Sequence, residues 1–115
     1  MDIHPMRLGN LEAQVAAMGA ELQSLRHQDR DLLWEGGSLW PRRAPLLFPI
    51  VGCLRGDTLR HGGLTYPLPK HGFARDRAFT WIERTPTACT LELVDDAATR
   101  AAYPFAFRLR VRHGL

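Results

Sequence analysis

The feature that most constrains this sequence is a regular alternation of large apolar side chains with small or charged ones near its end. Residues 105–112 read Phe-Ala-Phe-Arg-Leu-Arg-Val-Arg. Because successive side chains of a β-strand point to opposite faces, this pattern predicts a half-buried strand whose exposed face carries arginines. A strand with one apolar face and an open edge also needs a partner along that edge.

Similar alternation occurs in shorter segments earlier in the chain. Leu11, Ala13 and Val15 fall on one face of a predicted strand, while Glu12 and Gln14 fall on the other. The predicted elements are strands over 11–17, 21–26 (or a short helical turn there), 32–34, 57–60, 64–68, 79–84, 88–94 and 105–112, and a short helix over 95–102. Many short strands separated by turn signals predict an all-β protein, either a sandwich or a barrel.

Turn and cap residues fix some of these boundaries. Gly62 and Gly63 lie between two strand-like segments and predict the turn of a hairpin. Either Asp95 or Asp96 is placed to cap the short helix, which must end before Pro104.

Composition bounds the class of protein. The chain has 115 residues, which is enough for a single domain over residues 1–115. Its formal charge is only +3 and its arginines are scattered, so no nucleic-acid partner is predicted. No segment resembles a membrane span or a signal peptide. Cys53 and Cys89 lack metal or redox spacing, so a reduced cytoplasmic setting with no membrane association is the expectation.

Common catalytic and cofactor motifs are absent. The sequence has no phosphate-binding loop, no dinucleotide fingerprint, no His-Glu-x-x-His and no Cys-x-x-Cys. His61 and His71 stand ten residues apart without an evident third ligand, so neither a metal site nor a cofactor is predicted.

Two segments, 40–52 and 68–76, are dense in residue types that serve chemistry. Pro45 and Pro49 bracket the apolar run 46–48 in the first segment, which is therefore predicted to be extended and buried rather than helical. In the second, His71 suits proton transfer near neutral pH. Arg75 offers a planar set of donors for vicinal hydroxyls or a phosphate.

These two segments resemble the aldose 1-epimerase family, in particular its bacterial members. Residues 44–52 read Ala-Pro-Leu-Leu-Phe-Pro-Ile-Val-Gly, and residues 71–75 read His-Gly-Phe-Ala-Arg. The resemblance extends in order through 19–22, 33–34, Trp40 and 103–105, so it spans nearly the whole chain.

The resemblance implies an antiparallel β-sandwich of the galactose mutarotase type, here an incomplete N-terminal part of it. It also implies interconversion of the α and β anomers of an aldohexose, a small-molecule sugar partner, by acid/base ring opening. His71 matches the family's first active-site histidine and is the expected catalytic residue. Arg75, together with Arg43 or Arg42, is expected to bind the substrate.

The chain departs from the family in length and in catalytic residues. Family members are more than twice as long, and their second histidine and glutamate base lie in the later half. Cys53 also stands where many relatives carry arginine. The expectation is therefore a truncated protein that is inactive alone.

Two other functions stay open. One is a hexose-6-phosphate 1-epimerase in which Arg75 and either Arg42 or Arg43 grip the phosphate. The other is a non-catalytic sugar-binding or assembly module that forms a homodimer through its last strand.

Simpler interpretations of the candidate residues also stand. His71 could be a hydrogen-bonded loop residue, and Arg75 could pair with a surface carboxylate. The aromatic residues of these segments either stack on a sugar or belong to the core, as buried aromatics more often do. Asp57, Asp76 and Glu83 are each candidate bases, and no spacing selects among them.

Overall fold

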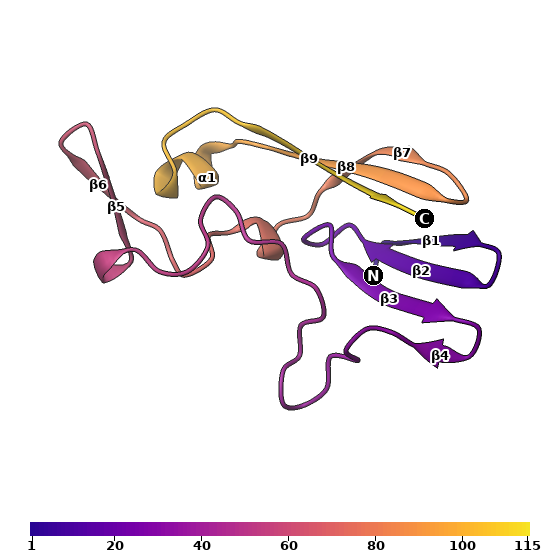
Figure 1. The fold of residues 1–115 in the computed structure, drawn as a ribbon. Helices are drawn as coiled ribbons and strands as arrows, with labels where there is room; N and C mark the ends of the chain where they lie inside the picture. Colours follow the sequence, from indigo (N-terminus) through magenta and orange to yellow (C-terminus); the bar gives the residue numbers. More distant parts are fainter.

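Three antiparallel sheets account for nearly all the regular structure of the computed structural model, which describes residues 1–115 (Figure 1). The first sheet has the order β1 (Ile3–Leu8), β2 (Leu11–Ala16), β3 (Leu22–His27) and β4 (Arg30–Asp31). A separate hairpin joins β5 (Thr58–His61) and β6 (Leu64–Pro67). The last sheet has the order β7 (Thr80–Arg84), β8 (Ala88–Val94) and β9 (Arg108–Gly114). Two 3₁₀ turns (Arg55–Asp57 and Ala74–Asp76) and the helix α1 (Ala97–Ala102) complete the structure.

Most of the predicted strands are confirmed within one to three residues. The segment over 21–26 is a strand and not a helical turn, since it pairs with β2 along its length. The predicted strand over 32–34 is wrong: β4 covers only Arg30 and Asp31, and the chain leaves the sheet after a last hydrogen bond from the Leu32 N–H to the Leu25 carbonyl. Strand β1 was not predicted, although it pairs with β2 over six residues.

The last strand begins later than predicted. β9 starts at Arg108 rather than at Phe105, because Pro104 and the turn after α1 precede it. Its alternation is confirmed: Arg108, Arg110 and Arg112 are exposed, while Leu109 and Val111 are half-buried.

The short helix is held by a capping box. The Asp96 carboxylate accepts a hydrogen bond from the Thr99 backbone N–H at 2.8 Å, and the Thr99 hydroxyl accepts one from the Asp96 N–H at 2.9 Å. This exchange satisfies two of the donors that a helix leaves free at its start. Of the two predicted caps, Asp96 is therefore the one used, and the Thr99 N–H lowers the pKa of its carboxyl.

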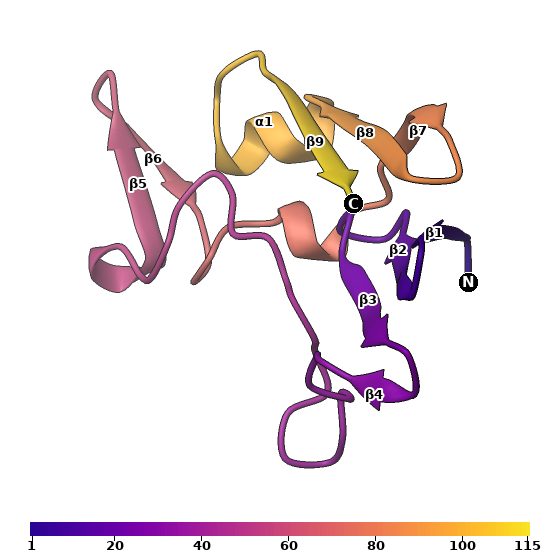
Figure 2. The same ribbon diagram turned by 45° about the vertical axis from the view of Figure 1, so that its right-hand side comes forward.

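The core lies between the first and the last sheet, which face each other (Figures 1 and 2). Strands β1 and β2 contribute Met6 and Val15, while Leu91 comes from β8 and Phe79 from the position just before β7. This arrangement is a β-sandwich, with apolar side chains of two sheets packed against each other.

Backbone hydrogen bonds also join the two layers. The Phe79 N–H donates to the Ala17 carbonyl, and the Gly19 N–H donates to the Arg77 carbonyl. At the far end of β9, the His113 ring lies 2.9 Å through Nε2 from the Ala20 carbonyl. These bonds fix the position of the last sheet relative to the first sheet.

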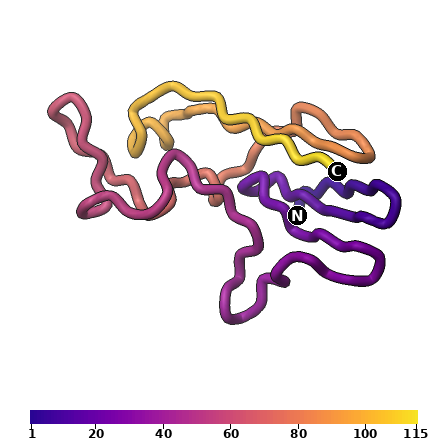
Figure 3. Tube along the Cα trace, viewed as in Figure 1, coloured from indigo at the N-terminus to yellow at the C-terminus, as the bar shows by residue number.

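The hairpin β5–β6 projects away from the sandwich (Figure 3). The radius of gyration is 16.1 Å, against roughly 13 Å for a compact domain of this length. Only 17 residues are buried, and the run 46–48, predicted to be buried, is half-buried, because no further layer lies over it. Much apolar surface therefore stays partly open, including an aromatic cluster formed by Phe48, Phe73, Tyr103 and Phe107.

The two candidate segments meet where Phe48 lies beside Gly72. The Phe48 carbonyl accepts hydrogen bonds from the Phe73 and Ala74 N–H groups at 2.9 and 3.2 Å. Gly72 is buried with φ +70°, and a Cβ built there would lie 2.2 Å from the Phe48 carbonyl oxygen. Only glycine fits this contact, because both the backbone conformation and the space exclude a side chain.

Replacing Gly72 with alanine is expected to destabilise the fold by about 3 kcal/mol or more, because left-handed strain adds to a backbone clash. Gly62→Ala is the matched control: φ there is +60° but no atom lies within 4 Å of the added Cβ. That variant should lose only about 1 kcal/mol. Chemical denaturation measures both values, and equal losses would show that the Phe48 contact is unimportant.

Candidate functional site

The candidate site is built on a reciprocal backbone contact between Gly52 and His71. The His71 N–H donates to the Gly52 carbonyl at 2.9 Å, and the Gly52 N–H donates to Nδ1 of the His71 ring at 2.9 Å. His71 has φ +64°, an uncommon conformation for a residue with a side chain. The two loops thus hold both the backbone and the ring of His71 in one orientation.

This contact also assigns the two ring nitrogens of His71. Nδ1 accepts a hydrogen bond from an N–H, so it carries no proton, and the proton of the neutral ring resides on Nε2. No protein atom is hydrogen-bonded to Nε2. The ring therefore offers an Nε2–H donor to a ligand.

The pKa of His71 lies below the ordinary value of 6.5. Desolvation contributes most, followed by the positive charges of Lys70 and then Arg75. The Gly52 N–H acts in the same direction, because it needs an unprotonated Nδ1. His71 is thus neutral at physiological pH and can serve as a hydrogen-bond donor without carrying a charge.

A cavity of about 460 Å³ opens beside His71. Its lining residues come from both candidate segments: Trp40, Arg43, Ala44, Pro45, Leu47, Lys70, His71 and Arg75. Three of the four predicted site residues are therefore brought together, namely His71, Arg75 and Arg43. The lining contains cations and a histidine but no carboxylate, so the cavity favours an electron-rich ligand.

The fourth predicted residue, Arg42, does not line this cavity. Its guanidinium lies 2.7 Å from the Asp76 carboxylate, with which it forms an ion pair. Asp76 is the last residue of the 3₁₀ turn Ala74–Asp76, so the pair ties the two segments together at their outer side. A role of Arg42 in ligand binding stays a prediction.

Lys70 and Trp40 also line the cavity. Lys70 was not proposed as a ligand-binding residue from the sequence, whereas Trp40 was one of the aromatic residues expected either to stack on a sugar or to belong to the core. Both belong to the segments singled out above, so their position in the chain was a usable signal. Trp40 is 46% exposed, and its backbone carbonyl accepts a hydrogen bond from the indole of Trp34 at 2.7 Å. A half-exposed indole at a cavity rim can stack on the apolar face of a sugar ring.

Glu21 holds the part of the cavity wall formed by Arg43 and Ala44. The residue is 8% exposed, and its carboxylate accepts hydrogen bonds from the Arg43 and Ala44 N–H groups at 2.8 and 2.9 Å. Arg43 also donates through Nη1 to the Gln23 carbonyl at 2.6 Å, at the start of β3. The position of Arg43 is therefore set by the first sheet, which the sequence did not indicate.

Arg75 is fixed mainly through its backbone. Its Nε atom is buried without a hydrogen-bond partner in the protein. A Cβ added to Gly19 would lie 2.8 Å from the Arg75 carbonyl oxygen, so the loop after β2 packs closely on this residue. A buried guanidinium donor without a partner is costly unless a ligand or water satisfies it.

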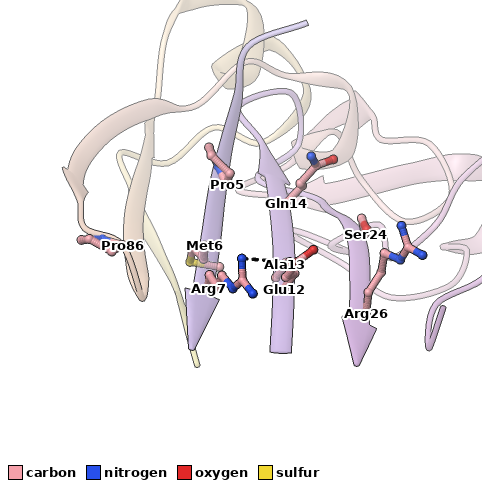
Figure 4. Close-up of a pocket in the computed structure, with 9 residues that line it drawn as sticks. All are labelled: Pro5, Met6, Arg7, Glu12, Ala13, Gln14, Ser24, Arg26 and Pro86. Atoms are coloured by element: carbon pink, nitrogen blue, oxygen red, sulfur yellow. Dashed lines mark ion pairs between the residues drawn. The ribbon is translucent and has the colours of Figure 1, made fainter. Parts of the chain in front are cut away.

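A larger hollow of about 510 Å³ lies on the outer face of the first sheet (Figure 4). Its lining comes from β1, β2 and β3 and from Pro86 in the β7–β8 turn. Its charged side chains form ion pairs: Arg7 with Glu12 at 3.6 Å, and Arg26 with Asp31, outside the lining, at 3.2 Å. This pattern is typical of a solvated sheet face. We place the candidate site at His71, where two loops converge on a histidine whose tautomer is fixed.

No group of three or more His, Cys, Asp or Glu side chains is placed to hold a metal ion. No helix is long and apolar enough to cross a membrane.

The comparisons with known proteins identify the fold first. A galactose mutarotase related enzyme from Lactobacillus acidophilus superimposes with a TM-score of 0.95 at 36% identity, over 98% of this chain and 39% of that one. A galactose mutarotase-like protein from Lactobacillus casei gives a TM-score of 0.94 at 35% identity, over 98% of this chain and 40% of that one. The predicted antiparallel β-sandwich of the galactose mutarotase type is confirmed.

The sequence comparisons then identify the family. The profile of the aldose 1-epimerase family matches residues 5–115. Protein LacX of Lactococcus lactis is 31% identical over 91% of this chain and 38% of its own length. The chain belongs to the aldose 1-epimerase family, and it spans about two fifths of the length of these relatives.

The pKa of His71 can be followed by NMR through the pH dependence of its ring resonances. We expect a midpoint below 6.5, with Nε2 protonated in the neutral form. Since the unfolded ring binds its proton more readily, stability should fall as the pH drops below about 6.5. Lys70→Gln should raise the midpoint, because it removes one of the two nearby charges. A midpoint at or above 6.5 in the unsubstituted protein would contradict this description of the site.

Glu21→Ala should cost about 1–2 kcal/mol of stability, because two partly buried N–H groups lose a charged acceptor. Glu21→Gln keeps one acceptor oxygen and should cost about half as much. Hydrogen exchange at the Arg43 and Ala44 amides should accelerate in the alanine variant before other amides do. Unchanged exchange there would mean that Glu21 does not hold the cavity wall.

Proposed function

We propose that this chain carries the sugar-binding part of an aldose 1-epimerase that acts on a free aldohexose, with His71 at the reacting end. The observation that carries the proposal is the fixed tautomer of His71 at the cavity, with Nε2–H as the free donor. Membership of the family supports it, as does a fold shared with galactose mutarotase-like proteins.

The chemistry needs two groups with opposite protonation. A base removes the proton from the anomeric hydroxyl, and an acid protonates the ring oxygen, so that the ring opens and recloses on either face. His71 donates a hydrogen bond from Nε2 to an oxygen at the anomeric end. Trp40 lies at the rim, where it would contact the apolar face of the ring.

The lining contains no carboxylate that could serve as the base. We therefore propose that this chain alone binds sugar but does not turn it over. A missing acid or base typically removes a factor of about 10²–10⁴ in rate. A chain that is a non-catalytic sugar-binding module would likewise bind sugar without turning it over.

A hexose 6-phosphate is the second candidate substrate. The specific observation that favours it is the set of cations at the cavity, namely Arg43, Lys70 and Arg75, without any neutralising carboxylate among the lining residues. The unpartnered Nε of Arg75 would gain an acceptor from a phosphate oxygen. Arg42, paired with Asp76, would have to leave that carboxylate to take part.

The test is to titrate the ¹⁵N-labelled chain with glucose, with galactose and with their 6-phosphates, and to follow mutarotation of the same samples by polarimetry. We expect binding to shift the Gly52 and His71 resonances while mutarotation stays at the spontaneous rate. His71→Asn should weaken binding at least about tenfold, because a hydrogen bond to the ligand is lost. His27→Asn, at an exposed position outside the cavity, is the control.

The outcomes separate the candidates. If Arg75→Gln weakens binding of the 6-phosphates far more than binding of the free sugars, the phosphorylated substrate is favoured. Acceleration of mutarotation by this chain would show that it does not lack the base. No shift with any of the four sugars would remove the proposed sugar site.

A further inference from the structure

The loop between β4 and the first 3₁₀ turn spans residues 32–54 without a helix or a strand (Figure 1). Irregular segments of this length in a compact domain are usually either functional or disordered. The part over 34–43 is held by hydrogen bonds and close packing, and it ends with Trp40 and Arg43, which line the cavity beside His71. The contacts that hold this part of the loop therefore shape one wall of the cavity.

Trp34 closes this part of the loop on itself. Its indole N–H donates to the Trp40 carbonyl at 2.7 Å, and the Trp40 N–H donates to the Gly37 carbonyl at 3.1 Å. Both backbone polar groups of Trp40 are thus bonded to residues of the same loop. Trp34 itself does not line the cavity. Its indole, which can only donate a hydrogen bond, instead fixes the peptide group that follows Trp40.

Arg43 is held in a different way from Trp40. A Cβ added to Gly36, where φ is +74°, would lie 2.9 Å from the Pro41 carbonyl oxygen and 3.0 Å from Nε of Arg43, so the loop packs closely on this side chain. The Arg43 N–H is also bonded to Glu21 and its guanidinium to the Gln23 carbonyl. The first sheet therefore fixes Arg43, whereas the hydrogen bonds of Trp40 come from within the loop.

The bond between Trp34 and Trp40 contributes more to the order of the loop than to the stability of the fold. It is exposed to solvent, so water can replace the lost donor at the Trp40 carbonyl. A ligand that contacts a loose side chain must order it on binding, which lowers affinity. Removal of the Trp34 donor should therefore affect a ligand that contacts Trp40 and should leave global stability nearly unchanged.

We propose that Trp34 is a positioning residue that holds Trp40 against the apolar face of a sugar ring bound in the His71 cavity. This inference rests on the proposed function and deepens it, because it names a residue outside the cavity that governs sugar affinity. Trp34 acts through Trp40. Since Arg43 is held by the first sheet and the other two cations belong to the second loop, binding of a small anion does not depend on Trp34.

The test follows glucose, galactose and inorganic phosphate in NMR titrations of the 115-residue chain and its variants. Ring protons of the bound sugars should shift upfield through the ring current of Trp40. Trp34→Phe keeps an aromatic ring but removes the donor, and it should weaken sugar binding about three- to tenfold while phosphate binding stays within about twofold. Trp81→Phe is the matched control, because it removes an indole N–H bond of similar length, 2.9 Å to Asp2, outside the cavity.

A double-mutant cycle tests whether Trp34 acts through Trp40. Trp40→Ala should weaken sugar binding by itself, and adding Trp34→Phe should then have no further effect, because the interaction partner is already gone. Additive losses would overturn the proposal, as would an equal loss of phosphate binding. A large fall in the denaturation midpoint of Trp34→Phe would identify Trp34 as a structural residue only and also overturn it.

The same titrations separate this inference from the proposed function. If the unsubstituted chain binds neither sugar, the proposed function fails and the role of Trp34 fails with it. If the unsubstituted chain binds sugar and Trp34→Phe binds it equally well, only the role of Trp34 is overturned. Sugar binding without an upfield shift would show that Trp40 does not stack on the ring, which also overturns the inference alone.

Discussion

The structure of the candidate site depends on the close approach of two loops at Phe48 and Gly72. A carbonyl that accepts two N–H groups, beside a buried residue without a Cβ, leaves the loops almost no relative freedom. Four residues beyond Phe48 the same two loops exchange the Gly52 and His71 hydrogen bonds. The orientation of the His71 ring therefore follows from backbone geometry. Surface substitutions elsewhere should leave that orientation unchanged.

Charge distribution distinguishes the cavity beside His71. This cavity is lined by Arg43, Lys70 and Arg75 without a carboxylate among the lining residues. Cations gathered without a neutralising carboxylate raise the local positive potential and favour electron-rich ligands. The ligand that we propose for this cavity is a sugar.

Much of the apolar surface of this chain is only partly buried. The two sheets share a core, but the aromatic cluster around Phe48 and Phe107 stays half-buried, and the β5–β6 hairpin stands clear of the sandwich. The relatives with solved structures extend well beyond the matched region. The chain nevertheless has its own sheet-to-sheet hydrogen bonds and its own closed core, which position the His71 loops.

The local sequence pattern predicted the elements whose structure depends on residues nearby in the chain. The alternation at 11–17, the turn at Gly62 and Gly63 and the cap at Asp96 each rest on interactions within a few residues, so the sequence predicted them. It did not predict β1, because the alternation there is interrupted by Pro5, and it placed a strand at 32–34, where only the Leu32 N–H still bonds to β3 before the chain leaves the sheet. The run 46–48 was correctly extended but is only half-buried, since burial depends on what packs over a segment.

The sequence also determined the family and the residues His71, Arg75 and Arg43 as candidates, because motifs are contiguous. Only the tertiary structure decided which contacts these residues make. The support of Arg43 by Glu21, the tautomer of His71 set by Gly52 and the pairing of Arg42 with Asp76 all join residues 19 to 34 positions apart. Such contacts follow from the folding of loops against sheets, and no local pattern encodes them.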